Sequence, residues 1–541
     1  MLRNALYFGD NLEVLRKHIA DRSVDLVYLD PPFNSRRAYN LIFRAPTGEE
    51  SAAQMKAFSD TWRWNPATQR SYEEIAASGQ AKLNELLRGF MDVLGRNDVM
   101  AYLVMMAVRL IELHRVLKDT GSIYLHCDPA TSHYLKTVMD VIFGPTNYRG
   151  EIVWQRTNAH SNVQRSFGRI HDTVLYYSKS ADFKWRMQYA PYSEEYLAIS
   201  YRHVEPETGR HYALRDLTAA MSRASTGQIY EWQGVRPPPS RCWACRREQM
   251  EAWDAQGRIH YSRSNYPRLK VYLDEMPGVP LQDIWTDIAP PGPAERLGFE
   301  TQKPEKLLER IILTSTDEGD VVLDPFCGCG TAVVAAQSLK RVWLGIDITH
   351  LAIALVKSRV GRAFGTSEGP FRDYQVVGEP TDEAGARALA EQDRDQFQWW
   401  ALSLIEAQPA TGERRRGPDR GVDGVVNFID DPTKAAAKIV VQVKSGMVHV
   451  KDIREFIQVV RTQRAAMGFF LTLEAPTRPM LAEAAGEGFY QDRLGRQYPR
   501  LQVLTVADIL RGQSFRAPVG GRIPHIKPAN RASKQGSLLD A

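Results

Sequence analysis

The feature that most constrains the fold is a strand, loop, helix and strand pattern over residues 320–348. A buried strand, DVVLDPF, precedes a loop with Gly328 and Gly330, and the helical TAVVAAQSL then leads to a second strand, RVWLGIDI at 341–348. Continuous apolar strands of this kind are typical of parallel sheets that helices cover on both faces. The pattern predicts a βαβ unit with a ligand-binding loop at the C-terminal end of its first strand.

The loop chemistry favours a nucleoside over a dinucleotide. Glycines directly after a strand let the backbone approach a ligand where the next helix begins. A dinucleotide fingerprint needs a third glycine, but Val333 stands at its position. Asp347, at the end of the next strand, is placed to bind ribose hydroxyls. A tight turn that serves packing alone is the alternative.

A second motif, Asp30-Pro31-Pro32-Phe33, ends another apolar run, VDLVYLD at 24–30. Each proline fixes its own φ and restrains the residue before it, which makes the turn rigid. A carboxylate and a main-chain carbonyl that accept from an exocyclic amino group would localise the nitrogen lone pair. They would also stabilise the positive charge that develops when this nitrogen attacks a methyl group. Phe33 would stack on a base that has left the duplex. The alternative is an ordinary strand-ending turn.

Five segments in a fixed order carry a family resemblance: LDPPFN, HCD, TQKPEKLLERII, LDPFCGCGTA and GIDI. Together they resemble the beta-class DNA amino-methyltransferases, over about residues 1–370. The resemblance implies S-adenosylmethionine as cofactor and Asp30, Pro31, Pro32 and Phe33 as the catalytic motif. It implies a cofactor site made by Asp10, Lys303, Asp324, Phe326, Gly328, Gly330, Thr331 and Asp347. Within that site Asp10 would lie near the adenine, Lys303 near the methionine carboxylate and Asp347 on the ribose. His126 and Asp128, in the HCD segment, end a strand at the same edge and could line the pocket. A polar strand end explains them better, and neither is predicted to be catalytic.

The same reading divides the front of the chain into three parts. Residues 1–179 and 296–374 are expected to form the catalytic and cofactor-binding halves of a Rossmann-like α/β domain. Between them, 180–295 has no sustained periodicity and is expected to be an inserted target-recognition region. Its stretch 201–270 holds eleven Arg, one Lys and eight aromatic residues, which suits a polynucleotide surface. A solvated arginine-rich face explains that composition equally well.

A second α/β unit is expected at 375–512, followed by a flexible basic tail at 513–541. Its segments GVDGVV and VQVKSG resemble the Mrr-type PD-(D/E)xK restriction endonucleases. If the hairpin closes symmetrically over a turn at 429–438, Asp423 lies opposite Lys444.

A divalent metal such as Mg²⁺ on Asp423, with Lys444 beside the attacking water, would support phosphodiester hydrolysis. Gln442 stands where the wider superfamily has an acid, so it would be a neutral ligand. The alternative is a charged pair across an exposed hairpin. No metal is expected in the methyltransferase part.

Composition excludes several other classes. The longest apolar run, 99–108, is shorter than the roughly 20 residues that a bilayer needs. Five cysteines suit a reducing compartment, so we expect a cytoplasmic protein without a membrane segment. None of them follows a proline, as the nucleophile of a cytosine C5-methyltransferase does. Cys242 and Cys245 form one CxxC without a second pair, so no zinc is expected.

The leading hypothesis is a site-specific DNA methyltransferase that modifies the amino group of a flipped base, preferably adenine N6, in a restriction–modification setting. Cytosine N4 is the nearest chemical alternative, because the same hydrogen bonds serve either amino group. A bifunctional enzyme that also cleaves DNA, and a catalytically silent DNA-binding scaffold, remain as further alternatives. Double-stranded DNA is the expected partner, and a homodimer is left open.

Overall fold

The computed structural model describes residues 3–32, 64–158, 167–223, 227–292, 295–297, 302–364, 374–409, 421–428 and 437–518. Phe33 of the predicted catalytic motif therefore lies outside the described residues. The chain separates into two compact units. One is Met187–Gln282, and the other combines Met1–Arg186 with Asp283–Ala541.

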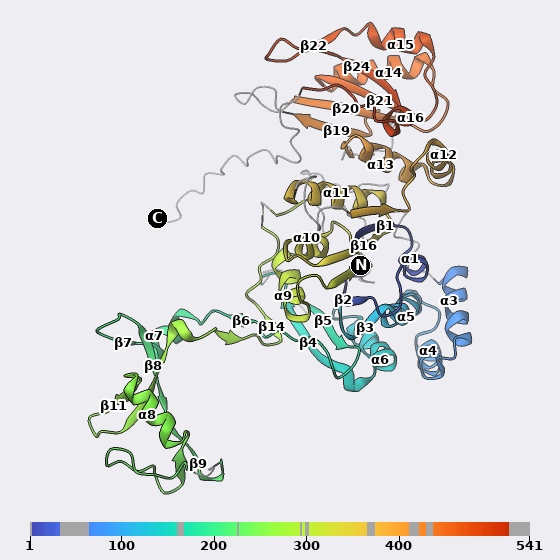
Figure 1. The fold of residues 1–541 in the computed structure, drawn as a ribbon. Helices are drawn as coiled ribbons and strands as arrows, with labels where there is room; N and C mark the ends of the chain where they lie inside the picture. Colours follow the sequence, from blue (N-terminus) through green and yellow to red (C-terminus); the bar gives the residue numbers. More distant parts are fainter. Residues whose placement is uncertain are drawn as a thin grey trace, which may run out of the picture. The chain divides into compact units, whose positions relative to one another are not determined.

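A nine-stranded sheet forms the core of the larger unit (Figure 1). From one edge to the other, its strands are β14 (Ile284–Trp285), β4 (Tyr148–Gln155), β5 (His171–Ser178), β3 (Leu117–Cys127), β2 (Val24–Leu29), β15 (Val321–Asp324), β16 (Val342–Asp347), β1 (Asn4–Phe8) and β17 (Tyr374–Val377). Within it, β5 runs antiparallel to β3 and β4, and the other neighbours pair in parallel. The predicted α/β Rossmann-like class is confirmed.

The chain leaves β2 and β15 in opposite directions across this sheet. From β2 it continues through α3 (Pro66–Ala77), α4 (Ala81–Leu94) and α5 (Asp98–Val116) to β3, whereas α10 (Thr331–Ser338) connects β15 to β16 on the other side. The two strands pair directly, with Leu26 opposite Val322 and Val27 opposite Leu323. Their C-terminal ends therefore form a topological switch point, the place where open α/β sheets bind ligands.

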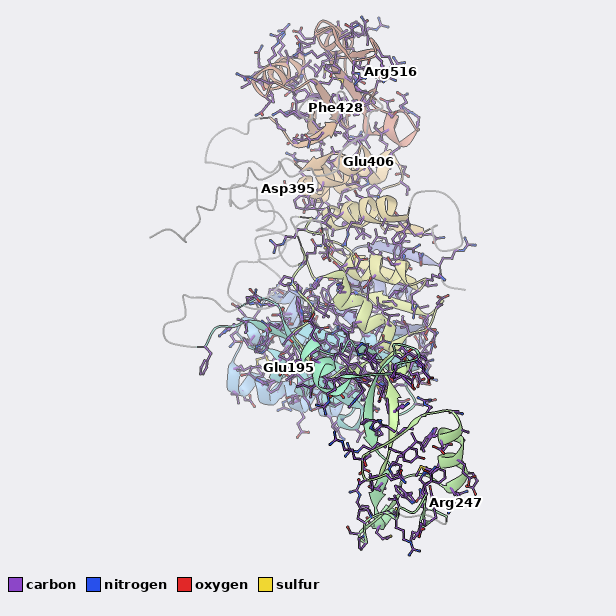
Figure 2. The ribbon with its side chains drawn as sticks, turned by 90° about the vertical axis from the view of Figure 1, so that its left-hand side faces the viewer. Glu195, Arg247, Asp395, Glu406, Phe428 and Arg516 are labelled. Carbon is purple, nitrogen blue, oxygen red and sulfur yellow. The ribbon has the colours of Figure 1, made fainter. Side chains whose placement is uncertain are left out.

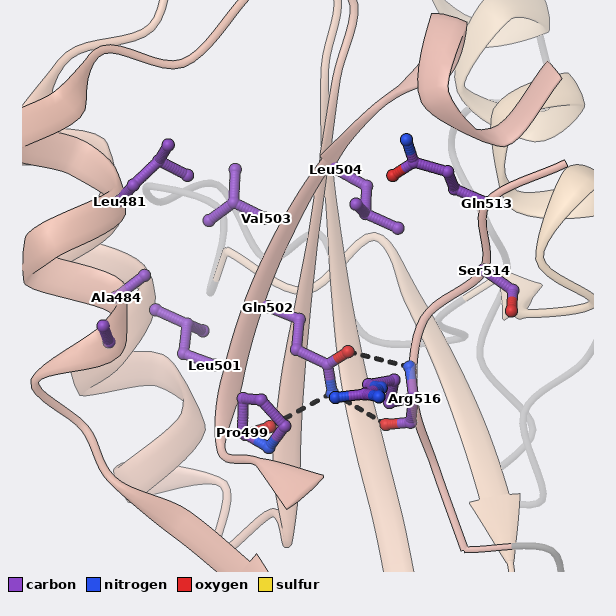
Figure 3. Close-up of a pocket in the computed structure, with 11 residues that line it drawn as sticks. Leu481, Ala484, Pro499, Leu501, Gln502, Val503, Leu504, Gln513, Ser514 and Arg516 are labelled. Carbon is purple, nitrogen blue, oxygen red and sulfur yellow. Dashed lines mark hydrogen bonds between the residues drawn. The ribbon is translucent and has the colours of Figure 1, made fainter. Parts of the chain in front are cut away.

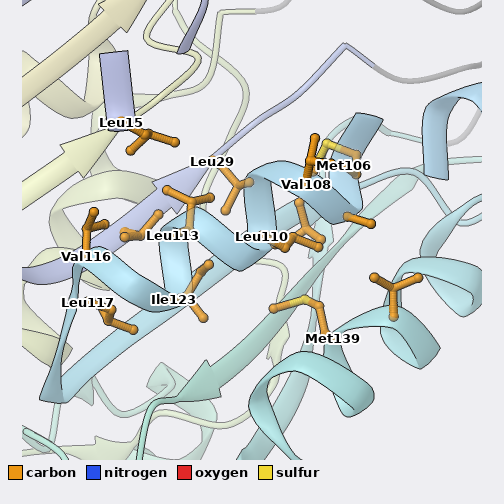
Figure 4. Close-up of a cluster of buried hydrophobic side chains, with 14 of the residues drawn as sticks. Leu15, Leu29, Met106, Val108, Leu110, Leu113, Val116, Leu117, Ile123 and Met139 are labelled. Atoms are coloured by element: carbon orange, nitrogen blue, oxygen red, sulfur yellow. The ribbon is translucent and has the colours of Figure 1, made fainter. Parts of the chain in front are cut away.

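Two apolar cores cover the two faces of the sheet. Successive residues of a strand point to opposite faces, so Val27 and Leu29 pack into one core and Leu26 and Tyr28 into the other. The first core is closed by α1 (Asn11–His18), α5 and α6 (Ser132–Phe143), and Figure 4 shows the α5 side chains against the strands. The second is closed by α9 (Glu305–Ser315), α10 and α11 (His350–Phe364).

The unit Met187–Gln282 has a small sheet of its own. Its four strands run in the order β11 (Ile259–Tyr261), β12 (Pro267–Tyr272), β8 (His211–Asp216) and β7 (His203–Val204). Two short ribbons accompany it, β9 (Thr218–Ala220) with β10 (Arg241–Trp243) and β6 (Tyr189–Ala190) with β13 (Val279–Pro280), as do α7 (Glu194–Ser200) and α8 (Arg247–Ala255). Trp243 and Met250 are fully buried in its core, and Arg247, labelled in Figure 2, lies over the Tyr230 ring. These strands have two to six residues, too few for a periodic signal, which is why the sequence pattern looked irregular.

The C-terminal part contains a five-stranded sheet between two helical layers. Its order is β18 (Gln408–Pro409), β19 (Gly424–Phe428), β20 (Ala437–Lys444), β21 (Met467–Thr472) and β24 (Leu501–Thr505). The helices α12 (Glu383–Gln392), α13 (Arg394–Leu404) and α16 (Val506–Leu510) pack on one face, and α14 (Val450–Thr462) and α15 (Arg478–Ala485) pack on the other. A small ribbon is formed by β22 (Phe489–Gln491) and β23 (Gln497–Pro499).

An apolar hollow lies beside the edge strand β24 (Figure 3). Leu481 and Ala484 of α15 line one side, and the segment around Arg516 lines the other. The Gln502 side chain of β24 connects the two sides, because it donates to the Arg516 carbonyl at 2.7 Å and accepts from the Arg516 amide at 2.8 Å. The hollow contains none of the predicted site residues. Among the described helices, none has the length and apolar character that crossing a membrane requires.

Asp25 links the two halves of the larger unit. Its side chain, 2% exposed, accepts from the Val321 amide at 3.0 Å and pairs with Lys118 at 2.7 Å and Lys184 at 3.2 Å. A carboxylate of β2 thus fixes the start of β15, which is almost 300 residues further along the chain.

We expect Asp25→Ala to lower the free energy of unfolding by about 3 kcal/mol, because it leaves buried partners without their counter-charge. This corresponds to a fall of roughly 6–12 °C in the Tm of the domain that contains the nine-stranded sheet, measured by calorimetry. Asp21→Ala is the matched control, since that carboxylate is 72% exposed and should contribute at most about 1 kcal/mol. Equal shifts for the two variants would contradict the linking role of Asp25.

Candidate active site

The two predicted motifs meet at the switch point. Asp30 directly follows β2, and the DPFCGCGT loop directly follows the neighbouring strand β15. The Asp30 carboxylate forms an ion pair with the ammonium of Lys303, which stands just before α9. Both side chains are largely buried, with 17% of Asp30 and 10% of Lys303 exposed. Pro31 and Pro32 continue the chain from this point along the sheet edge.

Local hydrogen bonds shape the glycine loop. The Phe326 amide donates to the Asp324 carboxylate at 3.0 Å, which turns the chain at the strand end. Gly328 and Gly330 both have positive φ, 48° and 77°, a region that favours glycine. A Cβ on Gly330 would lie 2.7 Å from Cγ2 of Val356, so this glycine also permits close packing against α11.

Thr331 is the first residue of α10 and is buried. Its hydroxyl lies 3.3 Å from the Arg359 guanidinium, which also donates to the carbonyl of Cys329 at 2.8 Å. Through this contact with Arg359, Thr331 holds the end of the glycine loop against α11.

Asp347 lies at the adjacent strand end and organises the loop from the side. Its carboxylate accepts from the Gly328 amide at 3.0 Å and from the amide and hydroxyl of Thr349, both at 2.9 Å. Burial raises its pKa above the usual range of a carboxyl. Each carboxylate oxygen can accept more than one hydrogen bond, so these contacts are compatible with the predicted ribose contact.

Asp10 caps α1 at the end of β1, next to Asp347. It accepts from the Leu12 amide at 2.7 Å and pairs with Arg109 at 2.9 Å, and Gly9 donates to the Asp347 carbonyl. The neighbouring Asn11 donates to the Pro325 carbonyl at 2.8 Å and so holds the glycine loop. The sequence patterns did not single out Asn11 or Arg109. The available signal was one arginine directly after the apolar run 99–108.

Asp324 lies at this edge together with Asp30 and Asp347 and is influenced by the charge of Lys303. Burial, and then the charges of Asp30 and Asp347, raise the pKa of Asp324 well above its usual range, although the Phe326 amide and Lys303 act in the opposite direction. An edge with this many acids fits a ligand that carries positive charge beside a nucleoside, as a sulfonium does.

The HCD segment separates into two roles. Asp128 accepts from the amide and hydroxyl of Thr131, at 3.0 and 2.7 Å, and so shapes the start of α6. His126 is fully buried and forms hydrogen bonds with Tyr28 and Asp172. It is therefore part of a buried polar network that includes Tyr28, two residues before Asp30, and the sequence pattern did not indicate this network.

The predicted pairing of Asp423 with Lys444 is wrong. The strands pair with Phe428 opposite Ala437 and Gly424 opposite Val441, so the register shifts by two residues from the symmetric hairpin. The shift brings Asp423 level with Gln442, because the Asp423 amide donates to the Val441 carbonyl at 2.8 Å.

The metal-binding role of Asp423, Gln442 and Lys444 stays a prediction. The Asp423 carboxylate accepts from Gln398 at 3.0 Å and from the Val443 amide at 2.7 Å, and Lys444 lies 4.0 Å from Asp452. Within the described residues, the side-chain amide oxygen of Gln442 (Oε1) is buried and accepts no hydrogen bond. No cluster of three or more His, Cys, Asp or Glu side chains suited to a metal ion occurs in the described parts of the chain.

The class of the protein follows from this fold, this edge and a match to a known family. Residues 24–358 match the DNA methylase family of N6 and N4 methyltransferases, and the chain belongs to that family. Residues 400–510 match a second family, described as NACHT-associated inactive restriction endonuclease 1. The restriction-endonuclease-like character of the C-terminal part is thereby supported, whereas the narrower Mrr type is not confirmed.

Individual relatives are methyltransferases of restriction–modification systems. The chain is 31% identical to the type II methyltransferase M.EcaI of Enterobacter cloacae, over 69% of this chain and 72% of that protein. It is 28% identical to the StyLTI Mod subunit, a type III restriction–modification enzyme of Salmonella typhimurium, over 62% of this chain but only 50% of that protein. Among solved structures, the cytosine-N4-specific PvuII DNA methyltransferase is similar with 12% identity and a TM-score of 0.33, over 70% of this chain and 95% of that chain.

We expect Gly330→Ala to lower the Tm of the methyltransferase domain more than Gly319→Ala. Both glycines have positive φ, 77° and 84°, so both substitutions cost roughly 1–2 kcal/mol of backbone strain. Only position 330 adds an overlap with Val356, worth about 1–3 kcal/mol, because no atom lies within 4 Å of a Cβ at 319. Calorimetry of the two variants measures the difference, and equal losses would rule out the packing role.

Proposed function

We propose that this chain transfers a methyl group from S-adenosylmethionine to N6 of adenine in double-stranded DNA, as part of a restriction–modification system. The observation that carries the proposal is the pairing of β2 with β15, which puts the Asp30 motif and the glycine loop on one edge. Membership of the DNA methylase family supports it, and so do the names of the relatives. Cytosine N4 remains the chemical alternative, since Asp30 would accept from either amino group.

In the proposed reaction, S-adenosylmethionine supplies an electrophilic methyl group when bound. Asp30 and the Pro31 carbonyl accept hydrogen bonds from the target amino group and hold its lone pair towards that methyl carbon. Phe33, outside the described residues, stacks on the flipped base.

The remaining assignments concern the cofactor. Asp347 binds the ribose, Asp10 lies near the adenine, and Gly328 and Gly330 leave room for the ligand beside the loop. The group is completed by Asp324, Phe326 and Thr331, which hold the shape of that loop.

Lys303 has two partners in this proposal. The Asp30–Lys303 ion pair occupies the carboxylate that has to accept from the target amino group. The carboxylate of the bound cofactor would form an ion pair with Lys303 and so separate Lys303 from Asp30. The positive charge of the cofactor sulfonium would then take the place of the Lys303 charge beside the acids of this edge. Lys303 thus keeps Asp30 neutralised until the cofactor binds.

Other parts of the chain receive proposed roles by position and composition. The arginine-rich residues 180–295, which contain the unit Met187–Gln282, would read the target sequence. The C-terminal part would bind DNA beside the methyltransferase. A cytoplasmic location and a homodimer stay predictions.

We expect Asp30→Ala to lower methyl incorporation into unmethylated genomic DNA by roughly 100-fold or more, because a transition-state acceptor is removed. Binding of S-adenosylhomocysteine, followed by calorimetry, should remain. The exposed Asp182→Ala is the matched control and should retain full activity. Modification-sensitive sequencing of the product identifies the base. An Asp30→Ala variant with wild-type activity would refute the role of Asp30, and a mark on cytosine would refute the adenine assignment.

We expect no Mg²⁺-dependent cleavage of plasmid DNA by the wild-type chain. Asp423 is level with the neutral Gln442 and not with a second acid, and the described residues hold no cluster of three His, Cys, Asp or Glu side chains suited to a metal ion, so the arrangement for hydrolysis is incomplete in that part of the chain. A nicking assay with Mg²⁺ and Mn²⁺ tests this expectation. Cleavage by the wild type that disappears in Lys444→Ala, but not in the exposed control Lys451→Ala, would establish the nuclease instead.

A further inference from the structure

A row of buried polar side chains crosses the sheet beside the catalytic motif. Tyr28 of β2 forms a 3.0 Å hydrogen bond with Nδ1 of His126 on β3, and Nε2 of His126 forms one of 3.1 Å with Asp172 on β5. The other oxygen of Asp172 lies 3.4 Å from Nε of Arg156. Tyr28, His126 and Asp172 are all at most 3% exposed.

The row lies in the apolar core, where polar groups are costly unless they are well paired. The Trp154 ring packs edge-on against His126, with ring centroids 5.9 Å apart. Tyr28 stands two residues before Asp30. Burial, and then the charges of Asp30, Asp324 and Asp172, raise the pKa of Tyr28 well above its usual range, so the phenol keeps its proton.

The charge of Asp172 determines which atoms donate and which accept in this row of hydrogen bonds. Burial acts to raise the pKa of Asp172, but His126, Lys303 and Arg156 together hold it below the usual range. Asp172 is therefore ionised and can only accept, so Nε2 of His126 carries the proton between them. When the ring is neutral, Nδ1 is then an acceptor, and the Tyr28 hydroxyl donates to it. The lone pairs of the Tyr28 oxygen are then directed away from His126.

We propose that His126 and Asp172 are positioning residues, which hold the Tyr28 hydroxyl with its oxygen towards the place where the target nitrogen becomes positively charged. This inference rests on the proposed function. During transfer the N–CH3 bond forms, the S–CH3 bond breaks, and positive charge passes from sulfur to nitrogen before a proton leaves that nitrogen for water. A fixed dipole with its negative end towards the nitrogen stabilises this change without rearrangement.

The substitution Asp172→Asn is expected to reverse the direction of the hydrogen bonds from Asp172 through His126 to Tyr28. Arg156 keeps an oxygen acceptor beside it, so the new amide group would turn its NH2 towards Nε2 of His126. That nitrogen must then accept, Nδ1 carries the proton, and the Tyr28 hydroxyl points the other way. Nitrogen-15 NMR of histidine-labelled full-length protein reads this tautomer directly, with the His126 signal assigned by its loss in His126→Gln.

We expect an Nε2–H signal in the wild type and an Nδ1–H signal in Asp172→Asn. In single-turnover methylation of unmethylated genomic DNA, Asp172→Asn should be roughly tenfold slower than the wild type, with S-adenosylhomocysteine binding unchanged. In the Tyr28→Phe background the same substitution should have no further effect, because the hydroxyl through which it acts is absent.

Two results would overturn the inference. One is an Nδ1–H signal in the wild type, and the other is an equal loss of rate from Asp172→Asn with and without the Tyr28 hydroxyl. Tm values of the variants identify any loss that reflects unfolding. A wild type that methylates no DNA would remove the proposed function and the catalytic role of the row together, whereas the tautomer spectrum would still decide its direction.

Discussion

The parallel pairing of β2 with β15 is the constraint on which the rest of the structure depends. Strands that are far apart in the sequence become neighbours, so the residues that follow them emerge at one edge. Asp25 fixes the start of this pair through the Val321 amide, and the Asp30–Lys303 ion pair closes its other end. The sheet edge, and not the order of the motifs along the chain, brings a rigid acceptor next to a glycine loop.

Electrostatics gives that edge its chemical character. Largely buried acids at the ends of three neighbouring strands are costly unless they are hydrogen-bonded or paired. Burial raises the pKa of Asp324, Asp347 accepts from the Gly328 amide, and Asp30 pairs with Lys303. Such an arrangement favours a ligand that brings positive charge. The buried row from Tyr28 to Asp172 extends the same polar environment into the core.

Much of this architecture was predictable because it depends on local patterns. The apolar runs near 24–30 and 341–348 and the glycine loop are readable from spacing, and the structure contains them as β2, β16 and the loop before α10. Contacts between neighbouring strands were not predictable in this way. The hydrogen bond between His126 and Tyr28 depends on which strands pair and in what register, and the parallel strands β2 and β3 have no turn that fixes it.

The hairpin of the C-terminal domain illustrates the same difficulty. A symmetric closure is a reasonable assumption for Asp423 and Lys444, but a shift of two residues replaces Lys444 by Gln442 as the neighbour of Asp423. Register depends on the geometry of the connecting loop, which residue types alone do not determine. The strands of Met187–Gln282 were not predicted for a different reason. They are so short that no alternation of apolar and polar residues can be recognised in them.

The most direct test of the central claim is a crystal structure of the chain with sinefungin, which carries an amine where S-adenosylmethionine carries its methyl group. We expect the nucleoside beside Gly328 and Asp347, Lys303 on the ligand carboxylate, and the ligand amine directed at Asp30, within the roughly 3–4 Å of a reacting pair. A ligand bound at another edge of the sheet, or one whose amine points away from Asp30, would contradict the account.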